Sequence, residues 1–216
     1  MDIKLEQVLP GEIERRSFEI IAEELQGRTF PADQEPIIKR VIHTSADFDY
    51  ADNLCFSEDA VAKAKEAIQR GACIVTDTQM VKAGINKKTL AKFGGEVLCF
   101  MSDEDVAAEA RTREVTRATV SMEKAAKMER ELIFAIGNAP TALVSLYQLI
   151  QEGKVSPQLI IGVPVGFVNV VSAKELIMTA GVPYIVAKGR KGGSNVAAAI
   201  CNALLYQLDR ERGGQR

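Results

Sequence analysis

The chain has 216 residues, a length that suits one large α/β domain with its own core. Hydrophobic residues make up 47% of it, charged residues 26%, and the formal net charge is −2. Nothing in this overall balance draws the protein to nucleic acid or to an anionic membrane, so any anion must meet a local basic site.

The cysteine and histidine content excludes further classes of protein. The four cysteines form no C-x-x-C pair and the chain has one histidine, a pattern that argues against a disulfide framework and against a zinc site. The first residues lack the apolar segment of a signal peptide, and no apolar run reaches the ~18 residues of a membrane span. We therefore expect a cytoplasmic single domain over residues 1–216, with no metal site of its own.

The first third of the chain predicts helices with one ambiguous segment. Apolar residues recur at helical spacing over 11–27, and a second short helix is expected over 35–43. Residues 48–56 fit either a short edge strand or an irregular hairpin arm. Ser57 is a typical N-cap residue followed by two acidic residues, so we expect a helix to begin there and to end at Gly71.

Beyond Gly71, five short apolar runs alternate with helical patterns. Runs without polar alternation suit strands buried on both faces, with helices as crossovers. The sequence therefore predicts a three-layer α/β/α fold with a doubly wound, mostly parallel, five-stranded, Rossmann-like sheet, whose strand order remains open. The expected strands are 73–75, 97–100, 132–136, 159–163 and 184–187. The expected helices are 86–93, 103–128 with a break, 140–152, 172–180 and 195–208.

In such a fold the ligand lies beyond the carboxyl ends of the strands, which directs attention to the loop KGRKGGSN at 188–195. Glycines let the backbone approach a ligand, and cations beside the start of the last helix favour a carboxylate or a phosphate. The loop matches neither a Walker A motif nor G-x-G-x-x-G, so it does not imply a nucleotide. A solvated glycine-rich turn explains it equally well.

A second loop, GNAPT at 137–141, follows another buried run. A proline near the first helical position makes a capped helix start the simpler interpretation. A binding role for this loop and its Asn138 becomes the better interpretation only if it lies next to 188–195.

His43 is the candidate for proton transfer, because an imidazole can gain or lose a proton near neutral pH. A lone histidine at an apolar helix end is, however, more often a packing residue. No Ser/His/Asp or Cys/His pattern accompanies it, so acid–base or isomerase chemistry fits better than nucleophilic hydrolysis. Arg113 and Arg117, four apart, would share a helix face; such arginines usually pair with glutamates but can clamp carboxylates.

Several stretches, in order and spacing, resemble the precorrin-8X methylmutase family of cobalamin biosynthesis. The resemblance covers about Arg15 to Leu205, and IHTSAD, GNAPTAL and GRKGGS are specific in combination. The stretches are RRSFEII, RVIHTSADFDYADNLCFS, GACIVTDTQMVKAGI, AIGNAPTALVSLYQLI, PVGFVNVVSAKELI and IVAKGRKGGSNVAAAICNAL.

The resemblance implies an isomerase that moves one methyl group between adjacent ring carbons of precorrin-8 or cobalt-precorrin-8, giving hydrogenobyrinate or its cobalt-containing counterpart, cobyrinate. It implies His43 as the general acid, no organic cofactor, any cobalt arriving with the substrate, and a homodimer with active sites at the interface. It also implies substrate-binding residues, to which the strand-end argument adds Asn138. The full set is Arg15, Arg16, Ser17, Thr76, Asp77, Thr78, Arg117, Asn138, Gly189, Arg190, Lys191, Gly192 and Gly193.

One stretch departs from the family pattern. Residues 169–171 (Asn-Val-Val) and Ala173 stand where small or acidic residues would be expected before a Ser-Lys pair, which puts Lys174 in doubt as a ligand. Two other functions remain as alternatives: a non-catalytic corrinoid carrier and a different Rossmann-like enzyme that binds phosphate through 188–195. The sequence does not distinguish the cobalt-containing from the cobalt-free substrate; we favour the former.

Overall fold

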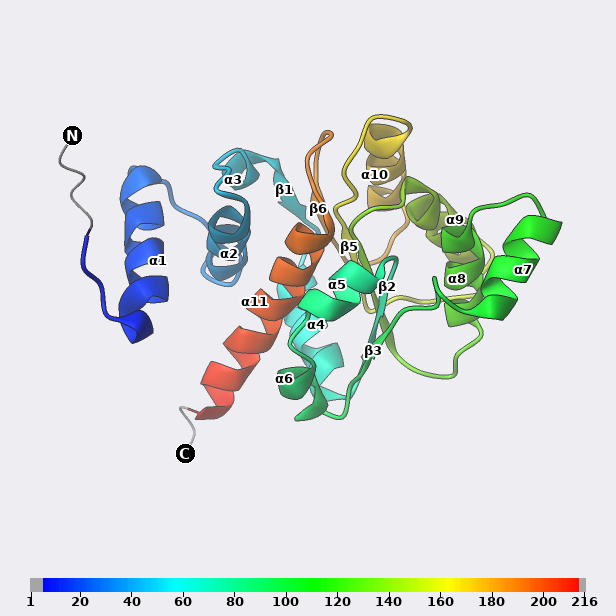
Figure 1. Cartoon of the computed structure of the whole chain (residues 1–216), viewed down its shortest axis with the longest axis horizontal. Coiled ribbons are helices and arrows are strands. Elements are labelled where there is room, and N and C mark those ends of the chain that lie inside the picture. The colour runs from blue at the N-terminus through cyan, green and yellow to red at the C-terminus, as the bar shows by residue number, and fades with distance from the viewer. Residues whose placement is uncertain (1–5, 214–216) are drawn as a thin grey trace.

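The computed structural model describes residues 6–213 and centres on one six-stranded sheet (Figure 1). Its strand order is β1-β6-β5-β4-β2-β3, and only β1 is antiparallel, to β6. The strands are β1 (Leu54–Phe56), β2 (Cys73–Thr76), β3 (Val97–Leu98), β4 (Leu132–Ile136), β5 (Leu159–Gly162) and β6 (Tyr184–Ala187). Counted among themselves along the chain, the five parallel strands have the order 2-1-3-4-5, which is a doubly wound order.

The expectation of five strands was wrong by one. The ambiguous segment 48–56 forms a short helix and then the edge strand β1, in which Leu54 pairs with Ala187 and Phe56 with Ile185. The prediction that Ser57 caps the next helix was also wrong. Ser57 continues the edge pairing, since its N–H donates to the Tyr184 carbonyl at 3.0 Å and its hydroxyl accepts the Tyr184 N–H at 2.9 Å. The helix starts after Asp59 instead.

The helices agree with the predicted pattern except at their ends and in two short additions, α3 and α5. The helices are a 3₁₀ turn η1 (Pro10–Glu12), α1 (Ile13–Glu24), α2 (Glu35–Ser45), α3 (Tyr50–Asn53), α4 (Ala60–Gln69), α5 (Gln79–Gly84), α6 (Lys87–Ala91), α7 (Glu104–Thr112), α8 (Arg117–Ala126), α9 (Pro140–Gln151), α10 (Val170–Met178) and α11 (Ser194–Gly213). The break expected within 103–128 is confirmed. It separates Arg113 from Arg117, so these two arginines do not share a helix face, because Glu114 turns the chain with a φ of 54°.

Helices cover both faces of the sheet, because alternate strand side chains point to opposite sides. Ile74 and Ile133 pack with α4, α5 and α11, whereas Val75 and Phe134 pack with α8, α9 and α10. Figure 1 shows that α2 lies outside α11 and that α1 lies outside α2, at one end of the molecule. The three expected layers are therefore present, with two further helices stacked on one side.

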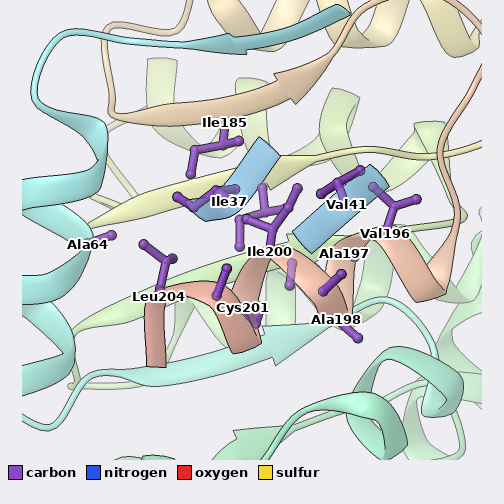
Figure 2. Close-up of a cluster of buried hydrophobic side chains, with 14 of the residues drawn as sticks. Ile37, Val41, Ala64, Ile185, Val196, Ala197, Ala198, Ile200, Cys201 and Leu204 are labelled. Atoms are coloured by element: carbon purple, nitrogen blue, oxygen red, sulfur yellow. The ribbon is translucent and has the colours of Figure 1, made fainter. Parts of the chain in front are cut away.

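Helix α11 is the centre of the larger core (Figure 2). Side chains from α2 (Ile37), α4 (Ala64) and β6 (Ile185) gather around Ile200, and all of them are buried. The small residues 197–199, all alanine, let neighbouring elements approach this helix closely. Since α11 begins directly after the loop 188–193, its packing with α2 ties the His43 helix to the carboxyl end of the sheet.

Candidate functional site

The loops that follow the parallel strands share one end of the sheet, at the top of Figure 1 for those after β5 and β6. We call this end, formed by residues 76–80, 137–141, 163–169 and 188–194, the loop edge. The order of the parallel strands reverses between β2 and β4, the position where doubly wound sheets bind ligands.

Asp77 occupies this reversal point and is fully buried. Its carboxylate accepts three consecutive backbone N–H groups, at 2.9, 2.7 and 2.6 Å, from residues 137–139. Burial raises the pKa of Asp77, while the three N–H donors act in the opposite direction. The donors in front of α9 therefore already bind an internal anion, and Asp77 acts on this loop rather than facing solvent.

The two glycine loops lie against each other, which is the condition under which 137–141 was expected to have a binding role. A Cβ on Gly137 would come within 2.8 Å of the Ser194 Cα, so only glycine fits there. The Ser194 hydroxyl in turn lies 3.0 Å from that of Thr78. Gly192 packs more tightly still, because a Cβ there would lie 2.1 Å from the Val163 carbonyl oxygen. The ends of β2, β4, β5 and β6 thus form one continuous surface.

Lys174, on α10, holds the loop 188–193 from its buried side through hydrogen bonds to the loop backbone. Only 1% of this residue is exposed, and its Nζ donates to the carbonyl oxygens of Gly189 and Lys191, both at 2.8 Å. Burial lowers the pKa of the Lys174 ammonium to about 8. Two acceptors need only two N–H groups, which the neutral amine also has, so both protonation states can hold the loop. Its atoms face the protein, which agrees with the doubt about Lys174 as a ligand.

Lys191 connects the loop edge to the segment after α2. Its ammonium lies 2.6 Å from a carboxylate oxygen of Asp47 and 2.6 Å from one of Asp49. The hydrogen bond from Lys191 lowers the pKa of Asp47, and the two carboxylates raise the pKa of Lys191. These ion pairs join the loop edge to the segment that follows His43, with Asp47 four residues beyond it.

His43 lies in the last turn of α2 and is exposed. Its ring stacks on Phe18 of α1, with ring centroids 5.2 Å apart and planes 14° from parallel. Helix α1 thereby comes next to His43 and brings the three family-implied residues 15–17 with it.

Those three residues form ion pairs and a hydrogen bond with residues of α1 and of the segment just before it. Arg15 pairs with Glu12 and Glu19, and Arg16 with Glu6 at 2.8 Å. The Ser17 hydroxyl donates to the Ile13 carbonyl at 2.9 Å. Within one chain, the arginines thus carry the glutamate pairing that is usual for surface helices.

Arg117 begins α8, next to the N-terminus of α9. The hydroxyl of Thr116 caps α8 and lies 3.0 Å from the hydroxyl of Thr141. Arg117 therefore stands beside the loop that contains Asn138. Arg113, which follows α7, instead forms ion pairs with Glu109 of α7 and Glu123 of α8.

An apolar surface accompanies these cations. Large exposed side chains follow the carboxyl ends of the strands: Met80 after β2, and Val165, Phe167 and Val168 after β5. Phe167 is 82% exposed and lies under the Arg190 guanidinium, which is 5.5 Å from its ring centroid. Apolar and cationic groups side by side suit a broad, partly apolar ligand that carries carboxylates.

Comparison with known proteins identifies the family. The family model described as precorrin-8X methylmutase matches residues 12–207. The chain belongs to the precorrin-8X methylmutase family. It is 48% identical to the cobalt-precorrin-8 methylmutase of Priestia megaterium, covering 94% of this chain and 90% of that protein. For the Salmonella typhimurium cobalt-precorrin-8 methylmutase the identity is 46%, with 92% and 96% covered.

The crystal structure of the Thermus thermophilus precorrin-8X methylmutase has the same fold, with a TM-score of 0.85, 39% identity and coverage of 93% of this chain and 98% of that one. The expected activity class is thereby confirmed: the chain is an isomerase of corrin-ring biosynthesis. Membership in a family of isomerases favours the enzyme over the carrier and over a phosphate-binding enzyme.

The methylmutase fold brings most predicted site residues to the loop edge, but with different exposures. Residues 188–191, Asn138 and Arg117 lie at its surface and Gly192 is half-buried, whereas Gly193, Thr76 and Asp77 are buried beneath it. The Thr76 hydroxyl donates to the carbonyls of Thr78 and Leu98, at 3.1 and 3.2 Å. Residues 15–17 lie apart on α1.

Sequence reasoning missed the residues that support the site. Asp47 lies in the quoted stretch IHTSADFD, yet nothing local pairs it with Lys191, far along the chain. Phe167 had a usable signal, because PVGFV places a large apolar side chain in the loop that follows a predicted strand, where the ligand is expected.

Two absences hold for residues 6–213. No helix there is both long enough and apolar enough to cross a membrane. This part of the chain also contains no cluster of three or more His, Cys, Asp or Glu side chains that could bind a metal ion.

Proposed function

We propose that this chain converts cobalt-precorrin-8, or the cobalt-free precorrin-8, by moving one methyl group between adjacent ring carbons, with His43 as the general acid. The observation that carries the proposal is an exposed imidazole on a helix whose following segment pairs with Lys191 of the loop edge, which combines apolar surface with cations. The names of the two relatives described above favour the cobalt-containing substrate.

The substrate class explains the mixed chemistry of the loop edge. The macrocycle of a corrinoid is broad and partly apolar, which suits the exposed Val165, Phe167 and Val168. Its carboxylates suit the guanidinium groups of Arg117 and Arg190 and the backbone donors of the loop 188–193. Thr76 and Asp77 then contribute by holding the loops, and residues 15–17 by contacting the ligand beside His43, next to which Phe18 places α1.

His43 supplies the proton that drives the migration. Protonation makes the conjugated ring electron-poor and thereby promotes movement of the methyl group to the neighbouring carbon. An isomerisation changes the net proton count of the substrate by zero, so the proton given by His43 is returned in a later step. All atoms and electrons stay within the substrate, and we therefore propose that the enzyme needs no organic cofactor and no metal of its own. The four cysteines are free, which fits the reducing cytoplasm as its location.

We infer further that the enzyme works as a homodimer with each active site at the interface. Binding sites for molecules of this size bury most of the ligand surface, whereas His43, Phe167 and Val168 are exposed in one chain. A second copy could supply the cover. Light scattering behind size-exclusion chromatography should give twice the mass of one chain; a monomer at assay concentration would overturn the interface.

The decisive experiment follows the visible spectrum of cobalt-precorrin-8 and of precorrin-8 with the wild type and with His43→Asn. We expect the wild type to convert the chromophore and the variant to bind it without conversion. A fully active His43→Asn would remove the general acid from the proposal. Binding without conversion by both proteins would favour the carrier, and binding of neither pigment would contradict the substrate class.

A further inference from the structure

A line of four side chains leads from α11 to His43. The Arg40 guanidinium lies 5.3 Å from the ring centroid of Tyr206 and 4.8 Å from that of Phe18. The Phe18 ring then stacks on His43, 5.2 Å away and nearly parallel. The side chains come from three helices, α11, α2 and α1, so the orientation of the imidazole depends on how these helices are joined.

Arg40 is the centre of this arrangement. It lies three residues before His43 on α2, so both side chains emerge on the same helix face, where one ring from α1 can cover both. Its side chain is only 13% exposed, and it also pairs with Glu14, one turn before Phe18 on α1. The hydrogen bond from Arg40 lowers the pKa of Glu14, which keeps the pair ionised at neutral pH. Arg40 therefore fixes α1 to α2 at the level of Phe18.

Close packing alone does not fix the Phe18 ring. A hollow of about 230 Å³ lies beside it, lined also by Pro36, Arg40 and Tyr206. Helix α1 packs chiefly against α2, and only Ile21 within it is buried. With free space on one side, the ring keeps its position through its contacts with the guanidinium and with the imidazole.

We propose that Phe18 and Arg40 are positioning residues for the methyl migration, and that they hold the His43 imidazole in the plane from which it protonates the macrocycle. This inference rests on the proposed role of His43. A general acid must lie within hydrogen-bonding reach of the atom it protonates, so a ring free to tilt presents its proton less often. Displacement of a reacting group by about 1 Å can lower a rate by roughly a hundredfold.

The test uses Phe18→Leu, which removes the ring but keeps an apolar side chain, and Phe18→Tyr, which restores a ring. Turnover of cobalt-precorrin-8 is followed in the visible spectrum. We expect Phe18→Leu to lower kcat by roughly ten- to a hundredfold with KM nearly unchanged, and Phe18→Tyr to recover most of it. The chain has a single histidine, so its Hε1 proton gives one NMR resonance. That resonance should shift in Phe18→Leu, because the ring current of Phe18 is lost.

Phe93→Leu is the matched control, because Arg212 lies 5.7 Å from the Phe93 ring centroid in the same type of contact near the C-terminal end of α11. It should leave kcat and the Hε1 resonance unchanged. Wild-type kcat in Phe18→Leu, or an equal loss in Phe93→Leu, would overturn the inference. If Phe18→Leu does not fold, the nuclear Overhauser effect between the Phe18 ring and the His43 Hε1 in the wild type decides, and its absence overturns the stack. His43→Asn separates the two proposals: inactive His43→Asn with active Phe18→Leu refutes only the positioning role, whereas active His43→Asn refutes the general acid.

Discussion

The loop edge and helix α1 both contribute to the proposed site, yet different forces hold them. The loop edge is fixed by buried charges with backbone partners, Asp77 and Lys174, and by glycines against which no Cβ would fit. Helix α1 is fixed by one buried side chain, Ile21, by the partly exposed Arg40–Glu14 ion pair and by one ring next to a hollow. Buried polar groups are costly to leave unpaired, whereas surface pairs contribute little. We therefore expect changes at the loop edge to lower stability and activity together, and changes on α1 to lower activity alone.

The largest effect is expected from Gly192→Ala. The new methyl group would overlap the Val163 carbonyl oxygen, so the loop must leave its place against β5. We expect the free energy of unfolding to fall by roughly 3–5 kcal/mol, measured by urea denaturation, with loss of turnover. Gly11→Ala, with nothing within 4 Å of its Cβ, is the control and should change little. Equal stability of the two variants would contradict the tight contact.

The second-largest effect on stability is expected from Asp77→Ala. It leaves the buried N–H of Gly137 and the partly buried N–H groups of Asn138 and Ala139 without their acceptor, which we expect to cost about 3 kcal/mol of unfolding free energy. Asp77→Asn keeps one carbonyl acceptor and should lose less. If thermal and urea unfolding do not separate the two variants, the carboxylate is not what holds this loop.

The pH dependence of stability tests Lys174. Its pKa is about 8 in the fold and near 10.5 in the unfolded chain, so between these values the unfolded state carries more protons and stability rises with pH. Relative to Lys174→Met, the wild type should therefore gain up to about 3 kcal/mol from pH 8 to 10.5. All other titrating groups are shared and cancel. A difference that stays constant over this range would show that Lys174 is not desolvated.

The smallest effect on stability is expected from Arg15→Ala on α1. Its side chain is 66% exposed and pairs only with neighbouring glutamates, so unfolding should be unchanged. Turnover should nevertheless fall through a raised KM if the arginine meets substrate carboxylates in the dimer. Lys88→Ala, another exposed cation on a helix far from α1, controls for net charge. Unchanged KM would remove Arg15 from the binding site.

The sequence by itself determined the alternation of strands and helices and the location of the glycine loops. Strands buried on both faces, such as 132–136, are uninterrupted apolar runs, and helices show their period locally. The rule that ligands bind beyond strand ends then selected 137–141 and 188–193 before any contact was known. The motif resemblance selected His43, which residue chemistry alone would have assigned to packing.

Only the tertiary structure decided which of these residues face a ligand and which hold the loops. Asp77 accepts N–H groups some sixty residues away, Lys191 pairs with Asp47 across more than a hundred, and β1 exists because Leu54 meets Ala187. A local pattern carries no signal for such pairings, because the energy of each contact depends on a partner that folding brings near. The stacking of Phe18 on His43 belongs to the same class, since it depends on how α1 docks on α2.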